Sequence, residues 1–446
     1  MENKQIKAVD FGKEFTWGVS ASALQTEGAH NVYGKGPSIW DEFADRNQIK
    51  GKQNHYVAAN FYHLFREDIA LIKEMGIPNF RFSLSWPRIL PDGIGRINQD
   101  GIDFYHQVID HCLANDIEPW ITLYHWDLPL FLEKKGGWTN REILVWFEEY
   151  VEVCIKAFGG KVKHWMVLNE PLVFTGAGYF AGIHAPGKKG IGNFLKAAHH
   201  AALCQAIGFR TIKKLQPSAI VGTTFSCTQV TPVDYSPSHV RAAKRMDALL
   251  NRFFIEPSLG LGYPIKDLPT LKKMNKYILP GDIENLKADF DFIGVQVYTR
   301  EVVSNSFFTP YLRAKLIPAK RRKVHHTRME WEVYPNSIYE MIKHFSSYEG
   351  VKSVIITENG SSFYDVPNKG RVHDLERVHY LKSHLENVYK ALLENHKIKG
   401  YFVWSLTDNF EWAEGFEQRF GLIYIDYETQ ERILKDSGYW YKDFLK

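Results

Sequence analysis

The sequence predicts an α/β protein in which residues 1–446 form a single (β/α)8 barrel domain. Short apolar runs alternate along the chain with longer stretches of helical periodicity, a pattern typical of repeated βα units and a parallel sheet. The apolar runs number eight, which is the number of strands that closes such a barrel. No linker rich in proline, glycine or serine divides the chain, and α/β barrels often run long as single domains.

Each expected strand is a short apolar run that begins a new βα unit. In chain order, the expected strands are Phe15–Ser22, Phe80–Trp86, Pro119–Trp126, Trp165–Asn169, Ala219–Phe225, Phe290–Tyr298, Val354–Glu358 and Gly400–Leu406. In a TIM barrel the carboxyl ends of all strands lie on one face, and that face carries the active site.

The helices between the strands are recognised by apolar residues that recur every three or four positions. Such stripes occupy 62–75, 102–112, 147–158 and 381–392, and Gly76 and Gly159-Gly160 follow the first and third as stops. Each stripe is expected to pack one helix face onto the barrel. By contrast, the basic segment Thr299 to Tyr334 shows no clear strand or helix, and we expect it to be a long loop over one rim.

Composition limits the kinds of partner. Hydrophobic residues make up 45% of the chain and charged residues 24%, which is ordinary for a soluble enzyme. The formal net charge of +4 is mild and predicts no nucleic-acid partner. The one basic run, Lys320 to Lys323, is interpreted as a solvated loop. Nothing in the composition indicates the oligomeric state.

Four widely spaced cysteines without C-x-x-C spacing predict no metal site. Cys112 and Cys154 fall on apolar positions of expected helices, where they should be small core residues. No apolar run resembles a signal peptide, and none approaches the ~20 residues that span a membrane. We therefore expect a cytoplasmic protein with no membrane partner.

Reactive and aromatic residues recur where the expected strands end. These residues are Gln25, Arg81, His125, Trp126, Asn169, Glu170, Tyr298, Glu358 and Trp404. Two opposed carboxyl groups such as Glu170 and Glu358 suit glycoside hydrolysis, in which one group protonates the leaving oxygen. A gap of ~5–5.5 Å lets the other attack directly with retention, whereas ~6.5–9.5 Å leaves room for water and gives inversion.

The chain resembles glycoside hydrolase family 1, the β-glucosidase family, over nearly its whole length. The residues that carry the resemblance are Phe15-Thr16-Trp17-Gly18, Gln25-Thr26-Glu27-Gly28-Ala29, Ser38-Ile39-Trp40-Asp41, Arg81-Phe82-Ser83, Leu123-Tyr124-His125-Trp126-Asp127-Leu128-Pro129, Asn169-Glu170-Pro171, Ile356-Thr357-Glu358-Asn359-Gly360 and Trp404-Ser405-Leu406-Thr407-Asp408-Asn409-Phe410-Glu411-Trp412. Each motif alone is only moderately specific for the family. The occurrence of all of them in one chain, in this order and with this spacing, is not explained by coincidence.

The resemblance implies a role for each matching residue. Glu358 would be the nucleophile and Glu170 the general acid/base, with Arg81 and Tyr298 keeping Glu358 ionised. The implied substrate-binding residues are Gln25, His125, Trp126, Asn169, Glu411, Trp412 and Phe420, with Trp404 as the platform under the sugar and Trp331 as a wall of the leaving-group site. No metal or organic cofactor is implied, because two carboxylates and water complete the reaction.

Glu411 bears on the substrate. A carboxylate there could accept hydrogen bonds from the sugar 4-OH and 6-OH and would repel a 6-phosphate. The phospho-glycosidase branch of the family typically has serine at that position and phosphate-binding lysine and tyrosine after it, where this chain has Gln418 and Phe420. Myrosinase-like enzymes have glutamine where Glu170 stands, so that branch is disfavoured too.

The chain also departs from the family pattern at several positions. Gln296 replaces the asparagine of G-I-N-Y-Y and adds a methylene beside the sugar 2-OH side, while Glu330 replaces a common glycine beside Trp331. Further departures are Val167, Phe253-Phe254 and Glu256. None removes a catalytic group, but the leaving-group site is expected to be unusual.

Three functional hypotheses remain open from the sequence. The first is a retaining exo-β-glucosidase acting on a small β-glycoside or short oligosaccharide and also accepting β-galactosides or β-fucosides. The others are a 6-phospho-β-glucosidase and a non-hydrolytic carbohydrate-binding barrel. Purely structural roles also stay open for Arg81, His125, Trp404 and Trp412. Trp17, Trp86, His55, His63 and His199 are interpreted as structural.

Overall fold

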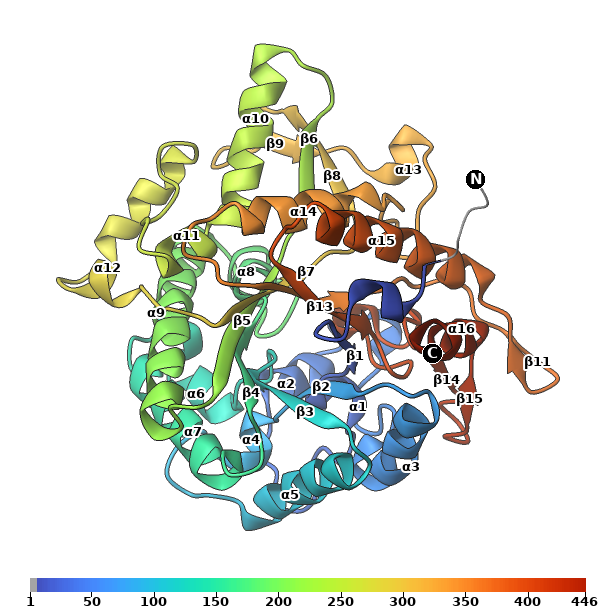
Figure 1. Cartoon of the computed structure of the whole chain (residues 1–446). Coiled ribbons are helices and arrows are strands. Elements are labelled where there is room, and N and C mark those ends of the chain that lie inside the picture. The colour runs from blue at the N-terminus through green and yellow to red at the C-terminus, as the bar shows by residue number, and fades with distance from the viewer. Residues whose placement is uncertain (1–5) are drawn as a thin grey trace.

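The computed structural model describes residues 6–446 and contains a closed barrel of eight parallel strands, as the sequence predicts. Figure 1 shows these strands at the centre of the molecule with helices around them. The barrel strands are β1 Thr16–Ser20, β2 Asn79–Ser83, β3 Glu118–Tyr124, β4 His164–Asn169, β5 Ile220–Ser226, β7 Phe292–Gln296, β10 Val354–Asn359 and β13 Ile398–Trp404. The ring closes because β1 pairs with both β13 and β2.

Several expected strands were too long at their carboxyl ends. The run predicted to end at Trp86 leaves the sheet after Ser83, and Trp86 instead begins α4, Trp86–Ile89, with Pro87 in its first turn. Proline suits that position because its missing N–H would be unpaired there anyway. Likewise Tyr298 lies beyond the end of β7, on the rim rather than in the sheet. These extensions place side chains above the barrel instead of inside its wall.

The four expected helical stripes are confirmed as helices. They are α3 Phe61–Glu74, α5 Gln99–Ala114, α7 Ile143–Phe158 and α15 Leu375–Leu393. The other helices are α1 Ala23–Thr26, α2 Ile39–Asp45, α4, α6 Leu130–Lys134, α8 Pro171–Gly176, α9 Ile191–Leu215, α10 Pro237–Asp247, α11 Ile255–Ser258, α12 Asp282–Asn285, α13 Ala319–Arg322, α14 Asn336–Ser346 and α16 Asp436–Leu445. Cys112 and Cys154 are buried on α5 and α7, as expected of core residues.

Short helical turns and small sheets complete the connections. The 3-10 turns are η1 Ala8–Phe11, η2 Lys50–Lys52, η3 Gly137–Thr139, η6 Pro269–Lys276 and η7 Trp412–Glu414, and the π-helical turns are η4 Ala177–Ala181 and η5 Ala248–Arg252. The strands outside the barrel are β6 Gln229–Pro232, β8 Arg300–Asn305, β9 Ala314–Leu316, β11 Pro367–Asn368, β12 Arg371–Val372, β14 Ile423–Ile425 and β15 Arg432–Leu434.

The interior of the barrel is filled by large apolar side chains. One cluster consists of Trp120, Met166, Phe292, Ile355 and Phe402, all buried and each from a barrel strand. Gly18 on β1 makes room for this packing, since a Cβ atom there would lie 2.2 Å from the ring of Phe402. The interior of the barrel is therefore a packed core, and a ligand-sized cavity lies above the strand ends.

The expectation that Thr299 to Tyr334 lacks strand and helix was wrong. β8 and β9 pair antiparallel within it, and β8 also pairs with β6 from elsewhere in the chain, while α13 covers part of the basic run. In Figure 1, this three-stranded sheet and α10 project together beyond the ring of helices. Local periodicity could not reveal these strands, because β9 is only three residues long and β6, the other partner of β8, lies far earlier in the chain. Of the basic run, Arg322 is half-buried and pairs with Glu332.

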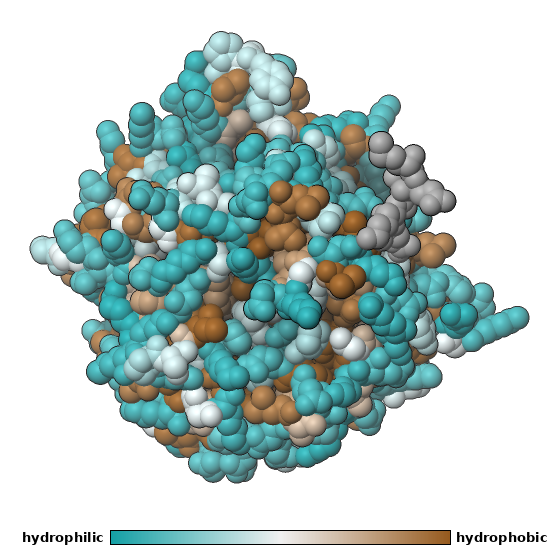
Figure 2. Space-filling view, in the orientation of Figure 1, coloured by the Kyte–Doolittle hydropathy of each residue, from teal (hydrophilic) through white to brown (hydrophobic). Residues whose placement is uncertain are grey.

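Trp17 and Trp86 are buried packing residues, as expected. The ring of Trp17 contacts Phe11 and Phe15, and Trp86 stacks on Tyr150 at 4.6 Å between ring centroids. His199 is buried between Tyr263 and Asp282, at 2.9 Å from each. Among residues 6–446, no helix is both long and apolar enough to cross a membrane. The face in Figure 2 is largely hydrophilic, with scattered hydrophobic groups.

Candidate active site

A cavity of about 850 Å³ opens over the carboxyl ends of the barrel strands, and most of the sequence-predicted site residues line it. These are His125, Trp126, Glu170, Tyr298, Trp331, Glu358, Trp404, Glu411, Trp412 and Phe420. The remaining three, Gln25, Arg81 and Asn169, are buried directly behind these residues and hydrogen-bond to them. The structure thus brings all the predicted residues into one place.

Glu358, near the end of β10, is held by three donors. Arg81 donates to Oε1 at 2.5 Å, Gln296 donates to the same oxygen at 2.8 Å, and the hydroxyl of Tyr298 donates to Oε2 at 2.7 Å. Burial raises the pKa of Glu358, while Arg81 and then Tyr298 oppose that rise. The three hydrogen bonds therefore fix the orientation of the carboxylate, and the positive charge of Arg81 stabilises its ionised form.

Glu170 follows the end of β4 and precedes α8, and its surroundings differ from those of Glu358. Burial raises the pKa of Glu170 well above its usual value, and the negative charge of Glu358 raises it further. A hydrogen bond with Ser226 and the positive charge of Arg81 oppose these effects only in part. Of the two carboxyl groups, Glu358 is the one to ionise first and Glu170 the one to keep its proton. This division matches an acid and a nucleophile.

Asn169 connects the donors that hold Glu358 to His125. Its Oδ1 accepts hydrogen bonds from Arg81 at 2.5 Å and from Gln296 at 2.8 Å, so its Nδ2 must be the atom that lies 3.0 Å from Nε2 of His125. Nε2 then accepts, which leaves the ring proton on Nδ1. Burial lowers the pKa of His125 well below its usual value, so the ring is neutral. Within residues 6–446, the buried Nδ1 has no hydrogen-bond partner, and its N–H is available to a ligand.

Glu411 and Gln25 form a second polar group. Nε2 of Gln25 donates to the backbone oxygen of Phe410 at 3.0 Å and to Glu411 at 3.3 Å, and its Oε1 accepts from Ser22 at 2.7 Å. Burial, reinforced by the charge of Glu358, raises the pKa of Glu411 to about 8. Its carboxyl group can therefore both donate and accept hydrogen bonds near neutral pH.

Aromatic rings form two walls of the cavity. The ring of His125 stacks with those of Trp404 and Trp412 at 5.9 and 5.8 Å, and Trp126 contacts Trp412 at 4.4 Å. Tyr298, Trp331 and Phe420 form a second group in the cavity lining, with ring centroids 5.3 to 6.2 Å apart. Flat apolar faces next to polar groups suit a ligand such as a sugar ring, which has both kinds of surface.

Three of the site residues have left-handed backbone conformations that side chains usually avoid. The φ angles are +75° at Trp126, +45° at Glu170 and +50° at Trp412. Such conformations cost on the order of 1–3 kcal/mol each and persist where the surrounding structure fixes them. Here they aim an acid and two indole rings into the cavity.

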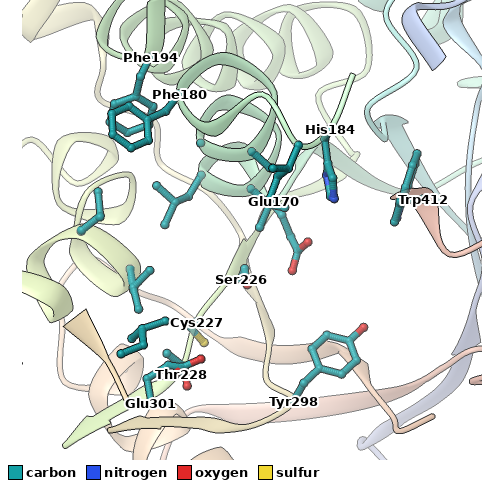
Figure 3. A pocket seen from close by; sticks show the side chains of 18 of the residues that line it. Glu170, Phe180, His184, Phe194, Ser226, Cys227, Thr228, Tyr298, Glu301 and Trp412 are labelled. Carbon is teal, nitrogen blue, oxygen red and sulfur yellow. The ribbon is translucent and has the colours of Figure 1, made fainter. Parts of the chain in front are cut away.

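Sequence reasoning missed several cavity residues. Figure 3 shows His184 and Ser226 beside Glu170, with Cys227, Thr228 and Glu301 farther along the same wall. Ser226 ends β5, and the rule that strand ends face the site could have found it. His184 lies on the connection after η4 and Glu301 lies on β8, both outside the barrel, so that rule gives no signal for them. Within the described part of the chain, no group of three or more His, Cys, Asp or Glu side chains could hold a metal ion.

Comparison with known proteins gives a consistent result. The family described as "Glycosyl hydrolase family 1" matches residues 7–446. The chain is 40% identical to a β-glucosidase A of Thermotoga maritima and to a 1,4-β-D-glucan glucohydrolase of Thermotoga neapolitana, in both cases over 98% of each chain. It also superimposes on a family 1 β-glucosidase from Thermotoga maritima in complex with isofagomine lactam, with a TM-score of 0.93, 39% identity and coverage of 97% and 98% of the two chains.

Proposed function

The chain belongs to glycosyl hydrolase family 1 and is a glycoside hydrolase, and from this premise we propose that it is a retaining β-glucosidase. Glu358 is the nucleophile, Glu170 is the general acid and base, and residues 1–446 form one catalytic domain. The observation that carries this proposal is the unequal environment of two buried carboxyl groups in one cavity. One is held by Arg81, Gln296 and Tyr298, and the other is surrounded so that it keeps its proton.

In the first step, the Glu358 carboxylate attacks the anomeric carbon of a terminal glucosyl residue. The bond to the glycosidic oxygen breaks, and Glu170 gives its proton to that oxygen, so that the aglycone leaves as a neutral alcohol. A covalent glucosyl–enzyme ester remains. Ester formation removes the charge of Glu358, and one of the causes that raises the pKa of Glu170 then disappears.

In the second step, ionised Glu170 acts as the base. It takes a proton from a water molecule whose oxygen attacks the anomeric carbon, the ester bond breaks, and the Glu358 carboxylate is restored. Two inversions at the same carbon release glucose with the β configuration. After the two steps Glu170 is protonated again and Glu358 is ionised again, so the site returns to its starting state. The mechanism as proposed uses no cofactor.

The sugar-binding end supports an unphosphorylated glucosyl residue. The free Nδ1–H of His125 can donate to a sugar hydroxyl, and Glu411 with Gln25 can bind two neighbouring hydroxyls. When ionised, Glu411 repels a 6-phosphate, and when protonated it offers no positive charge to bind one, so the phospho-glucosidase alternative is disfavoured in either state. Because Glu411 can reach either epimer at C4, β-galactosides and β-fucosides are expected to be secondary substrates.

Release of nitrophenol from nitrophenyl glycosides tests the proposal. The panel contains the β-glucoside, β-galactoside, β-fucoside, α-glucoside and 6-phospho-β-glucoside, each with wild type and with Glu358→Ala. We expect turnover of the β-glucoside that disappears in the variant, and NMR of the first-formed product should show β-glucose. Preference for the phosphorylated substrate would contradict the assignment of Glu411. Sugar binding without turnover would instead support a carbohydrate-binding protein.

A further inference from the structure

The cavity continues past Glu170 into a region that is almost entirely apolar, which we call the apolar arm. In Figure 3, Trp412 lies on one side of Glu170, and Phe180 and Phe194 lie on the other. The apolar arm is lined by Leu172, Phe180, Phe194, Leu249, Leu268 and Leu271. At about 850 Å³, the whole cavity lies toward the upper end of the ~300–1,000 Å³ typical of ligand sites. It has room for a large group besides one sugar.

The apolar arm is built from connections rather than from barrel strands. The ring of Phe180, on η4, contacts Phe194 on α9 at 5.9 Å and Tyr311 of the β8–β9 connection at 6.3 Å. At its rim, Phe180, Ile183 and Leu316 are 41%, 63% and 43% exposed. A group of exposed apolar side chains around a cavity is typical of a binding site, because a ligand can remove that surface from water.

Polar groups are few in the apolar arm. Ser226, Thr228 and Glu301 contribute the oxygen atoms visible at its base in Figure 3. Burial raises the pKa of Glu301 to about 7, against the opposing charge of Arg322, so the surroundings of this carboxyl group disfavour its charged form. A second glucose unit carries hydroxyl groups on all sides, and most of them would be buried here without hydrogen-bond partners. Burial of unpaired hydroxyls is unfavourable.

We propose that the apolar arm binds an extended alkyl or aryl aglycone, so that this glycosidase prefers β-glucosides of apolar alcohols to cellobiose. The inference rests on the proposed function in one respect. Because Glu170 protonates the glycosidic oxygen, the leaving alcohol lies on the side of Glu170 away from the sugar-binding end. The side chains on that side, and not those of the sugar-binding end, then select the aglycone.

A series of alkyl β-glucosides tests this preference. Methyl, butyl, hexyl and octyl β-glucosides are compared with cellobiose below the concentrations at which the longer compounds form micelles. The butyl, hexyl and octyl alcohols have nearly equal leaving-group acidity, so a trend along this series reports binding rather than chemistry. We expect kcat/KM to rise about two- to fourfold for each added methylene. A flat series, or cellobiose hydrolysed as well as octyl glucoside, would overturn the inference.

Two glutamine variants locate the effect. Phe180→Gln should lower the octyl-to-methyl ratio of kcat/KM by about three- to tenfold, because the chain loses an apolar contact. Phe131→Gln is the matched control, since Phe131 is 44% exposed and lies on α6 outside the cavity. The octyl-to-methyl ratio of Phe131→Gln should equal that of wild type. If Phe180→Gln and Phe131→Gln give the same ratio, the proposal is contradicted. Ile183→Gln, at a still more exposed rim position, repeats the test if Phe180→Gln is poorly folded.

Failure of the proposed function would be distinguishable from failure of this inference. If no β-glucoside is hydrolysed, calorimetric titration of wild type with methyl and octyl β-glucoside still measures the apolar arm directly. Tighter binding of the octyl compound, reduced in Phe180→Gln, would support the arm without turnover. Equal binding of both compounds would reject it.

Discussion

The two ends of the cavity are built in opposite ways. At the sugar-binding end, Arg81, Asn169 and Glu358 come from barrel strands and are fixed by hydrogen bonds of 2.5 to 3.0 Å. In the apolar arm, Phe180 and Phe194 come from the π-helical turn η4 and the helix α9, outside the barrel wall, and contact each other through their aromatic rings.

This difference indicates what each end can do. Directional hydrogen bonds on a rigid barrel hold reacting groups in one geometry, which catalysis requires. Apolar surface is not directional, so the arm can accept ligands of various shapes and changes easily between related proteins. Chemistry and aglycone choice should therefore be separable by mutation.

The largest effect is expected for Glu358→Ala. Without a nucleophile, kcat for nitrophenyl β-glucoside should fall by about 10⁴-fold or more. Binding of octyl β-glucoside, measured by calorimetry, should persist because the apolar arm is unchanged. Added azide can take the place of the missing carboxylate and should yield α-glucosyl azide. Substantial turnover without azide would mean that another group is the nucleophile.

The effect of Glu170→Gln should depend on the aglycone, because Glu170 lies between the two ends of the cavity and protonates the leaving group. General acid catalysis contributes about 10²–10⁴-fold, but only where the leaving group needs a proton. Hydrolysis of octyl β-glucoside should thus lose far more than hydrolysis of a dinitrophenyl β-glucoside, whose leaving group departs as an anion. The measurement is the loss of kcat/KM for each substrate, which reports only the first step, because Glu170 also serves as the base of the second step. Equal losses would contradict the role of Glu170 as the acid.

A smaller effect is expected for Gln296→Leu, which removes the amide that donates to Glu358 and Asn169. Loss of a hydrogen bond to a charged group should lower kcat by about 10- to 100-fold for every aglycone alike. Gln205→Leu is the control, because Gln205 is also buried, accepts a hydrogen bond from Thr223 in the barrel wall and does not line the cavity. A change in aglycone preference would show that the two ends are coupled.

The smallest effect concerns pH. Activity needs Glu358 ionised and Glu170 protonated, so kcat/KM should fall at acidic pH as Glu358 gains a proton and at alkaline pH as Glu170 loses one. Burial raises the pKa of both groups, which should move both limits above those of ordinary carboxyl groups. In Glu358→Gln the pKa of Glu170, measured by carbon NMR, should fall, because a neighbouring negative charge is gone. An unchanged value would mean that burial alone sets it.

Much of the sugar-binding end could be predicted from the sequence. Apolar runs mark the barrel strands, and residues such as Asn169 and Glu358 stand at or near strand ends, where parallel strands converge. The motifs around them supplied the expected roles. By contrast, Phe180 and Ile183 gave no signal, since apolar residues outside the barrel strands look the same whether they face solvent, core or ligand.

The sequence by itself determined the barrel, its helices and the identity of the residues at its carboxyl face, because these depend on local periodicity and on strand order. Only the tertiary structure decided that β8 and β9 pair within a segment expected to be a loop, that β6 joins them from elsewhere in the chain, and that connections from distant parts of the chain enclose the apolar arm. It also decided the different pKa values of Glu170 and Glu358. The reason is physical: pairing, enclosure and pKa depend on neighbours brought close by folding, and sequence distance does not encode them.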